Sequence, residues 1–585
     1  MPEYLAPGVY VEETSFRAKS IEGVSTSTTA FVGPTRKGPF RVNLDDSSTP
    51  ELLTSYGDFE RIYGSFADLS LGANTPRTNY LAHAARAFFN EGGARLYVAR
   101  VVGAGATPAG VVLTAPDGPE PARIGFTARF PGSAGNGRII VREVVTPASR
   151  VVMDNAPAGS VLRTGPNDAL AHHVKVGSEW RPAANLGQAA ANPATLAGGE
   201  PRVVSLTVTV RDADGNETSY EDLGLERTHP RWVGYVLAAQ PSRRADQLEN
   251  LYAINLGADV TALALHTQFF QNVAPNAQGM RVREIELTGG TDGGAPGIAA
   301  YALALGQIAS LEDISIVAAP GSSAYPDAQA VTGALIAHAE ARRAYRIAVL
   351  DTPPQQTPGQ ARTLRGQVDS RYAALYYPWV IVANPLARPG REDIPRELAL
   401  PPSGFVSGVY ARNDIDRGVH KAPANEVVRS ALRFEIDVNF GQQEMLNPIG
   451  VNCLRFLSGR GYRVWGARLT SSDPEWKYVS DRRYFIYLEA SIDRGTQWAV
   501  FEPNGERLWA NVRQTISDFL YNEWSNGRLL GATQEEAFFV RCDRSTMTQN
   551  DLDNGRLVCL IGVAILKPAE FVIFRIGQKT ADARA

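Results

Sequence analysis

Two glycine-rich segments have the spacing of sites that hold phosphate groups. Residues 33–38 read GPTRKG, but Pro39 and Phe40 stand where a lysine and a hydroxyl residue must contact phosphate and magnesium. Residues 132–137 read GSAGNG and precede a predicted strand, so their amides would not be aligned with the dipole of a following helix. We interpret both segments as structural turns and expect no cofactor.

Side chains that could bind a metal ion or act in catalysis are scattered along the chain. The only clustered histidines are the neighbours His172 and His173, and adjacent loop residues rarely chelate one ion. The three cysteines, Cys453, Cys542 and Cys559, lack the paired spacing of a zinc site or a disulfide framework, so we expect reduced structural thiols. We predict no metal site, and residue spacing alone selects no catalytic group.

Length and composition are those of a globular protein with several domains. A chain of 585 residues exceeds the size of one hydrophobic core, and 44% hydrophobic with 20% charged residues excludes a disordered chain. The formal charge of -3 gives no reason to expect direct contact with nucleic acid. No apolar run approaches the ~20 residues of a membrane span, so we expect no stable membrane insertion. The N-terminus lacks the pattern of a signal peptide, which indicates a protein made in a cytoplasm.

Hydrophobic periodicity divides the chain into five regions. We predict an N-terminal arm (1–25), the first part of a core (26–103), an inserted β-rich domain (104–280), the main part of the core (281–455) and a C-terminal domain (456–585). In the core, apolar strands alternate with amphipathic helices, which predicts a mainly parallel sheet covered on both faces.

The C-terminal region contains one strongly amphipathic helix and two apolar closing segments. The helix is predicted near Glu506 to Trp524, with one apolar stripe made by Leu508, Val512, Ile516, Phe519 and Leu520. The closing segments, Leu557 to Ile565 and Phe571 to Ile576, are apolar enough to predict strands of a buried sheet.

Motifs at both ends and in the centre of the chain resemble the contractile tail sheath family of phages and related particles. They are Ala6–Glu13 (APGVYVEE), Leu287–Gly293 (LTGGTDG), Ile314–Gly321 (ISIVAAPG), Asn447–Asn452 (NPIGVN), Val464–Arg468 (VWGAR), Trp476–Val479 (WKYV), Phe501–Asn504 (FEPN) and Lys567–Phe571 (KPAEF). One departure is Leu469, which separates Arg468 from the threonine that directly follows it in the family.

The resemblance implies a multidomain α/β fold. It consists of a subtilisin-like α/β core with an outer β-rich insertion (104–280), and of an inner α+β C-terminal domain (456–585) that strands from neighbouring subunits complete. Residues 1–25 would be the N-terminal linking arm. The implied assembly is a homo-oligomer of hexameric rings, stacked helically around a tail tube protein between a baseplate and a tail terminator.

The implied function is that of a structural late protein in a virion tail, assembled in the host cytoplasm. The sheath would contract and drive the tube through the target cell envelope, which delivers the genome during virus entry. The sheath of a bacterial phage-like contractile injection system, with an effector as cargo, is the alternative.

Three sets of residues follow from this resemblance. The arm strand that a neighbour would accept is Val9, Tyr10, Val11 and Glu12. The acceptor strands would contain Leu557, Val558, Leu560, Phe571, Val572 and Ile573. The predicted helix would face the tube through Arg507, Arg513 and Asp518, and a wholly solvated polar face is the alternative.

A subtilisin-like core also raises the alternative of a serine hydrolase. Ser403, before a predicted helix, stands where a subtilase nucleophile would be. However, the chain has no His-Gly-Thr for the general base, and Leu350-Asp351-Thr352-Pro353 lacks the glycine of the acid motif. We therefore expect the architecture without the chemistry, and a protein that is not an enzyme.

Overall fold

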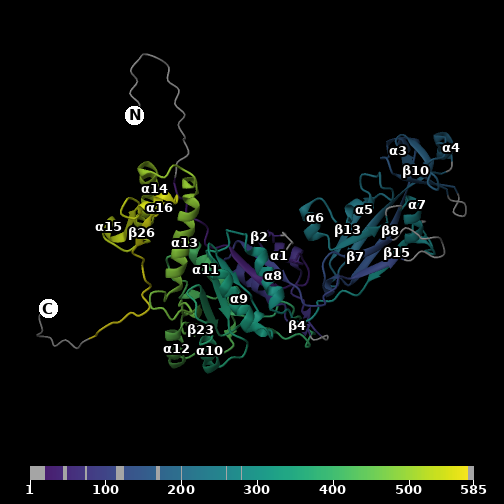
Figure 1. The fold of residues 1–585 in the computed structure, drawn as a ribbon. Coiled ribbons are helices and arrows are strands. Elements are labelled where there is room, and N and C mark those ends of the chain that lie inside the picture. The colour runs from purple at the N-terminus through teal and green to yellow at the C-terminus, as the bar shows by residue number, and fades with distance from the viewer. Residues whose placement is uncertain are drawn as a thin grey trace, which may run out of the picture.

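The computed structural model describes residues 20–43, 49–72, 76–113, 124–165, 171–198, 200–257, 260–277 and 280–576. The molecule is elongated, with the outer domain at one end, the core in the middle and the C-terminal domain at the other end (Figure 1). The predicted arm strand, Val9 to Glu12, lies outside the described residues.

A nine-stranded sheet forms the centre of the core. In spatial order its strands are β2 (Leu52–Leu53), β5 (Leu96–Val101), β1 (Thr29–Pro34), β16 (Ile316–Ala318), β17 (Ile347–Asp351), β18 (Ala373–Tyr377), β23 (Val451–Leu457), β24 (Gly461–Val464) and β21 (Glu426–Val427). The six strands from β5 to β23 are parallel, and the others are antiparallel edge strands.

Helices cover both faces of this sheet, which confirms the predicted architecture. One face packs against α2 (Tyr80–Glu91) and α11 (Pro402–Asp416). The other face packs against α8 (Ile298–Ile308), α9 (Ala328–Glu340), α10 (Pro358–Arg365) and α12 (Phe440–Leu446). Smaller elements of the core are α1 (Tyr56–Tyr63), the pair β3 (Leu69–Ser70) and β4 (Pro76–Arg77), and a sheet of β20 (Glu397–Leu400), β19 (Val380–Ala383) and β22 (Arg433–Phe434).

The outer domain is built around two antiparallel sheets. The larger contains β11 (Glu179–Pro182), β10 (Ala171–Val176), β9 (Val161–Thr164), β12 (Arg202–Arg211), β8 (Gly137–Pro147) and β15 (Val282–Leu287), with β13 (Glu217–Leu223) on β12. The smaller contains β14 (Tyr252–Leu256), β7 (Ile124–Ala128) and β6 (Gly110–Leu113). Its helices are α3 (Arg150–Asn155), α4 (Pro193–Gly198), α5 (Val233–Val236), α6 (Arg244–Glu249) and α7 (Ala262–Phe270).

Two of the predicted region boundaries fall inside sheets. The boundary after residue 280 would place β15 in the core, but β15 pairs with β8 over its whole length and so belongs to the outer domain. The boundary after residue 455 cuts through β23, which forms a hairpin with β24 at the edge of the core sheet. The partner of β15 lies far away in the sequence, so the composition around residue 280 does not reveal it. The β23–β24 hairpin has no composition signal that would mark it as part of the core sheet.

The junction between core and outer domain is polar. Arg36 of the core donates to the carboxylate of Asp214 at 2.6 Å and to the hydroxyl of Ser133 at 2.9 Å. The Ser133 hydroxyl in turn donates to Asp292 at 2.8 Å. Arg36 is 8% exposed and Asp214 15%, so this ion pair is largely shielded from water.

The C-terminal domain contains α13 (Val479–Gly495), α14 (Glu506–Ser525), α15 (Gln534–Ala537), α16 (Gln549–Asp553) and the two-stranded sheet of β25 (Phe538–Arg541) and β26 (Leu560–Val563). The predicted amphipathic helix is confirmed, since every residue of the predicted apolar stripe is buried in the core of this domain. The helix ends just before Gly527, which has a φ of 70° that favours glycine.

The two predicted closing strands differ from what the structure shows. The first is shortened to β26, and Leu560 is 51% exposed, so it does not lie in a buried sheet. Residues 571–576 form no strand in the single subunit, and their apolar side chains are exposed. An alternating apolar pattern predicts a strand, but it does not say whether the partner strand belongs to the same chain.

None of the described helices is both long enough and apolar enough to cross a membrane.

Candidate assembly site in the C-terminal domain

A single carboxylate fixes the point where the C-terminal tail leaves the folded domain. Glu570 accepts two hydrogen bonds from Arg468, at 2.8 and 2.6 Å. Asn447 donates to the same carboxylate at 2.7 Å and Tyr478 at 2.9 Å, while the Lys477 ammonium lies 3.6 Å away. We call these five residues the tail clamp. Four segments that are separate in the sequence meet at this one carboxylate.

The tail clamp is held in place by the backbone around it. The side chain of Asn452, fully buried in β23, accepts from the amide of Arg468 at 2.6 Å and donates to its carbonyl at 2.7 Å. A β-bridge joins Arg468 to Tyr478, which directly precedes α13. Arg468 is therefore positioned by the core sheet, and the core holds the tail through it.

The electrostatics of the clamp favour an ionised Glu570. Burial acts to raise the pKa of this carboxyl group, but hydrogen bonds from Arg468, Asn447 and Tyr478 outweigh it and lower the pKa to about 2. A charge-assisted bidentate pair of this kind also fixes orientation, because both carboxylate oxygens are engaged. The direction in which residues 571–576 leave the domain is thus set by Glu570.

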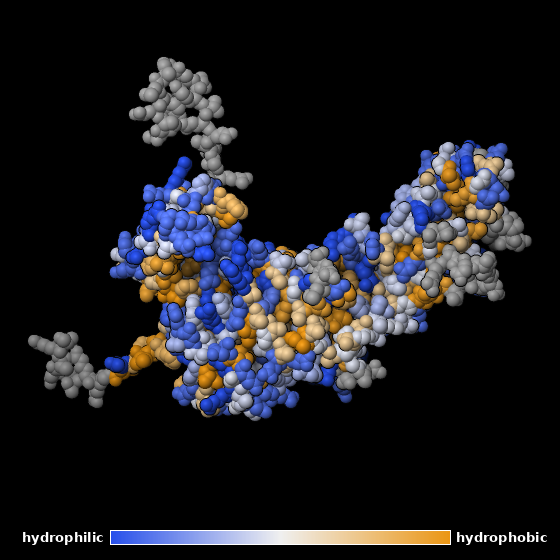
Figure 2. Space-filling view, in the orientation of Figure 1, coloured by the Kyte–Doolittle hydropathy of each residue, from blue (hydrophilic) through white to orange (hydrophobic). Residues whose placement is uncertain are grey.

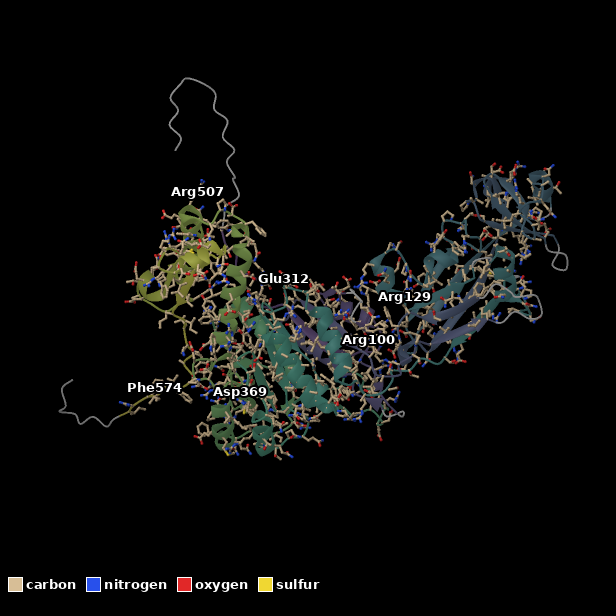
Figure 3. The ribbon with its side chains drawn as sticks, viewed as in Figure 1. Arg100, Arg129, Glu312, Asp369, Arg507 and Phe574 are labelled. Atoms are coloured by element: carbon tan, nitrogen blue, oxygen red, sulfur yellow. The ribbon has the colours of Figure 1, made fainter. Side chains whose placement is uncertain are left out.

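Beyond Glu570 the described tail, residues 571–576, is exposed and, except for Arg575, apolar. The exposed fractions are 69% for Phe571, 68% for Val572, 79% for Ile573, 83% for Phe574 and 96% for Ile576. Figure 2 shows this segment as an apolar stretch that projects from the body, and Figure 3 labels Phe574 on it. An apolar run of this size, left in water, marks a contact that one subunit does not make by itself.

The sheet of β25 and β26 offers the matching feature. Among the described residues β26 pairs only with β25, so the backbone groups along its other edge have no strand partner. A two-stranded sheet is marginal in water, and an exposed edge of this kind is a template for another strand. The predicted acceptor residue Leu560 lies in β26, whereas Leu557 and Val558 lie just before it. Phe571, Val572 and Ile573 lie in the exposed tail and not in this sheet.

A second ion pair holds the chain where the described N-terminal segment joins the body. Arg483 of α13 donates to both oxygens of Asp414, at 2.8 and 2.6 Å, and to the carbonyl of Thr26 at 2.9 Å. The Thr26 hydroxyl also donates to Asp414 at 2.6 Å, and Ile21 is buried against the C-terminal domain. Both ends of the described chain are therefore fixed by arginine–carboxylate pairs close to α13.

The predicted tube-facing residues lie on the solvent side of α14. Arg507, Arg513 and Asp518 are all exposed, and Figure 3 shows Arg507 at the far end of the C-terminal domain. Their hydrogen bonds within the subunit are few: Arg513 donates to the Cys542 carbonyl at 3.4 Å, and Asp518 accepts from Gln514 at 2.7 Å.

Ser403, the candidate nucleophile of the hydrolase alternative, has another role. It lies in the first turn of α11 with no exposed surface, and its hydroxyl donates to Asp351 at 2.5 Å. Asp351 also accepts from the Ser403 amide at 2.7 Å, as a carboxylate does at a helix N-terminus. The serine is thus bonded to a carboxylate and not to a histidine. Among the described residues, no group of three or more His, Cys, Asp and Glu side chains could hold a metal ion.

Sequence reasoning missed the tail clamp, the ion pair at Asp414 and the open edge of β26. The signal for the clamp was present, because Glu570 is the one charged residue between Pro568 and the apolar tail. Its partners could not be paired with it, since they come from three distant segments.

Comparisons with known proteins cover the same regions. Residues 294–470 match the phage tail sheath protein central domain, and residues 471–579 match the phage tail sheath C-terminal domain. A prophage major tail sheath protein of Pseudomonas aeruginosa (strain UCBPP-PA14) is 26% identical over 267 residues, which are 45% of this chain and 64% of the relative. The match thus spans less than two thirds of that curated relative.

Three solved structures share the fold. The sheath complex of PVC, an extracellular contractile injection system, in its contracted state is 19% identical, with 99% of both chains covered and a TM-score of 0.52. The contracted helical sheath of the anti-feeding prophage is 22% identical, with 98% and 100% covered and a TM-score of 0.52. A sheath tail protein of Listeria innocua is 12% identical, with 94% and 97% covered and a TM-score of 0.51. Residues 294–579 of this chain thus carry the central and C-terminal domains of phage tail sheath proteins.

Proposed function

We propose that this chain is the subunit of a contractile tail sheath. Copies of it polymerise as stacked rings around a tail tube and shorten to drive the tube through a cell envelope. The observation that carries this proposal is the pair of complementary features in one domain. Among the described residues, the exposed tail that Glu570 holds and the outer edge of β26 both lack a strand partner.

Strand exchange between subunits satisfies both features at once. The tail of one subunit adds to the edge of β26 in the next, and each backbone hydrogen bond contributes about 0.5–1.5 kcal/mol net. Donor and acceptor are different surfaces, so the contact is heterologous and propagates into rings or helices. Repetition in every subunit gives the lattice its strength through multivalency.

The N-terminal arm supplies the second link of the same mesh. Its strand, Val9 to Glu12, is too short to be stable alone and needs a sheet edge. It precedes the segment that Arg483 and Asp414 fix against α13, so it starts from the same domain that holds the acceptor sheet. Replacing Val9 and Val11 by proline should give folded subunits that sediment as monomers, and normal tubes from this variant would exclude the arm as a link.

Contraction in this proposal is an exchange of subunit contacts. The extended sheath is a kinetically trapped state, and contacts formed in the contracted state supply the work when a baseplate opens. The exchanged strands keep subunits connected while the rigid domains rotate. A tail terminator closes the opposite end.

The exposed side of α14 is the surface that we assign to the tube. Arg507, Arg513 and Asp518 make few contacts within the subunit, which suits a polar interface that must release during contraction. Reversing Arg507 and Arg513 to Glu should weaken co-sedimentation with tail tubes and leave tube-free polymerisation unchanged. Equal behaviour in the two assays would favour a solvated face.

The main proposal is tested by removing the tail. A chain that ends after Glu570 keeps the tail clamp and the hydrophobic core of the domain, so it should fold but sediment as a monomer and show no tubes by negative-stain microscopy. Tubes formed by the shortened chain would contradict the proposal.

The particle that this sheath serves is a virion tail or a bacterial injection device, and the two share the assembly described above. Microscopy of particles from the source distinguishes them by the presence of a DNA-filled head. We expect no hydrolase activity, and peptidase or esterase turnover that disappears in Ser403→Ala would contradict this.

A further inference from the structure

Two cysteines stand directly opposite each other at the end of the two-stranded sheet. The last pair of the ladder is Arg541 with Leu560, so the next positions outward are Cys542 on one strand and Cys559 on the other. Both side chains belong to the hydrophobic cluster of the C-terminal domain, Cys542 buried and Cys559 half-buried. The two thiols interact with each other, side chain to side chain.

The hydrogen-bond pattern places this pair at a favourable distance. The amide of Ala564 donates to the carbonyl of Ala537 at 2.8 Å, and these two residues are opposite each other when the ladder is continued. Bonded and non-bonded pairs alternate in an antiparallel ladder, which makes Cys542 and Cys559 a non-hydrogen-bonded pair. The Cα atoms of such pairs lie about 4.5 Å apart. A disulfide spans Cα separations of about 4.4–6.8 Å, so the pair can close without a movement of the backbone.

We propose that Cys542 and Cys559 form a disulfide when the protein meets an oxidising low-molecular-weight disulfide. They are free thiols in this structure. The half-buried Cys559, as thiolate, attacks one sulfur of the small disulfide, which releases one small thiolate and leaves a mixed disulfide on Cys559. The Cys542 thiolate then attacks the Cys559 sulfur and releases the second small thiolate. Two protein thiols are thereby oxidised and one small disulfide is reduced to two thiols.

The surroundings make this reaction slow but selective. Burial raises the pKa of Cys559 to about 12 and also raises the pKa of Cys542, so little thiolate is present at neutral pH. The rate should therefore rise with pH. Cys453, buried in β23 of the core sheet, has no thiol beside it among the described residues and should stay reduced.

The bond would fasten the segment between the two strands, residues 543–558, which contains α16. In a reducing cytoplasm the pair stays open, and outside the cell it can close. The consequence for assembly rests on the proposed function. The sheet of β25 and β26 can still change its conformation while subunits assemble, and the disulfide fixes it once the particle has left the cell.

The test uses the purified full-length protein and oxidised glutathione. After incubation at pH 8.5 and at pH 7, free thiols are alkylated in denaturant and tryptic peptides are mapped by mass spectrometry. We expect one intramolecular bond between Cys542 and Cys559, formed at least ~5-fold faster at the higher pH, with Cys453 fully alkylated. Two separate glutathione adducts, a bond between two chains, or two free thiols would overturn the proposal.

Variants keep the result separate from folding and from assembly. Cys559→Ser should retain the fold and give no bond, whereas Cys453→Ser should form the bond as the natural chain does. Oxidation should raise the Tm of the natural chain and leave the Tm of Cys559→Ser unchanged. Because peptide mapping is done on subunits, a failure of the tail-deleted chain to assemble does not affect it, and each proposal can fail alone.

Discussion

Among the described residues, β12 of the outer domain and β26 of the C-terminal domain differ in how many neighbouring strands they have. In the outer domain β12 has neighbours on both sides, β8 along one edge and β9 and β13 along the other. In the C-terminal domain β26 has one neighbour, and the apolar residues that follow it project into solvent. In the proposed assembly, β26 therefore finds its second neighbour in another chain, whereas β12 finds both neighbours in its own chain.

Two carboxylates with arginine partners, one in each domain, show the same difference. Glu143 of the outer domain is fully buried and contacts Arg163 at 3.2 Å, His266 at 2.9 Å and Arg281 at 3.0 Å, so it ties the strands of its own domain together. Glu570 instead ties the exposed tail to Arg468 of the core. Glu143 thus stabilises the fold of its own domain, whereas Glu570 fixes the point where the tail leaves its domain.

The largest effect is expected from breaking the tail strand. Replacing Val572 and Phe574 by proline removes two amide donors, and the subunit should lose polymerisation while keeping its Tm, since neither side chain is packed. The control is Val151→Pro, an exposed apolar residue in the first turn of α3, where proline is tolerated. Sedimentation velocity measures polymerisation in both variants. Tubes formed by the double-proline variant would show that the tail strand does not link subunits.

Neutralising Glu143 should cost stability without affecting assembly. Glu143→Gln leaves Arg163 and Arg281 without their counter-charge in a buried site, which should lower the free energy of unfolding of the outer domain by roughly 2–4 kcal/mol. Urea denaturation monitored by tryptophan fluorescence measures this loss. The critical concentration for polymerisation at low temperature should not change, and a large rise would show that the outer domain carries subunit contacts.

Neutralising Glu570 should have the opposite pattern. Glu570→Gln weakens the pairing with Arg468 and frees the base of the tail, so the critical concentration should rise roughly tenfold, the ratio that corresponds to about 1.4 kcal/mol. The Tm of the subunit should move little. Glu312→Gln, which loses only a surface contact with Arg494 at 4.0 Å, is the matched control. An unchanged critical concentration in Glu570→Gln would refute a positioning role for the clamp.

The core should show a pH response of its own that is separate from assembly. Burial raises the pKa of Asp351 to about 7, above its ordinary 3.8, so the folded state holds a proton that the unfolded state releases. The stability from this group is present below about pH 4 and is lost as the pH rises through 7. Asp351→Asn mimics the protonated form, so its free energy of unfolding should fall less between pH 5 and pH 8 than that of the natural chain. Parallel curves for the two proteins would contradict this assignment.

The smallest effect on assembly is expected from removing the outer domain. The amide of Gly294 donates to the carbonyl of Ala104 at 3.0 Å, so the two ends of the core are close enough to be joined by a short glycine linker. Such a chain should polymerise within about threefold of the natural critical concentration, because the tail, β26 and α14 all remain. A chain that folds but never assembles would show that the outer domain takes part in the lattice.

The sequence predicts local elements well and long-range partners poorly. The stripe on α14 and the alternation of strands and helices in the core follow from periodicity, which depends on neighbours a few residues apart. The exposure of Phe571 and Val572 could not be predicted, since an apolar strand reads the same whether its partner is in the same chain or in another. The tail clamp was equally hidden, because Arg468 and Tyr478 meet Glu570 only through the fold.

Hydrogen–deuterium exchange, measured on subunits and on assembled tubes, tests the account most directly. In free subunits the amides of residues 571–576 should exchange within seconds, and those on the open edge of β26 should exchange faster than those bonded to β25. In tubes both segments should become protected together, by about 100-fold or more, while the strands of the outer domain change little. Protection of the outer domain with a tail that still exchanges freely would contradict the claim that strand exchange in the C-terminal domain builds the sheath.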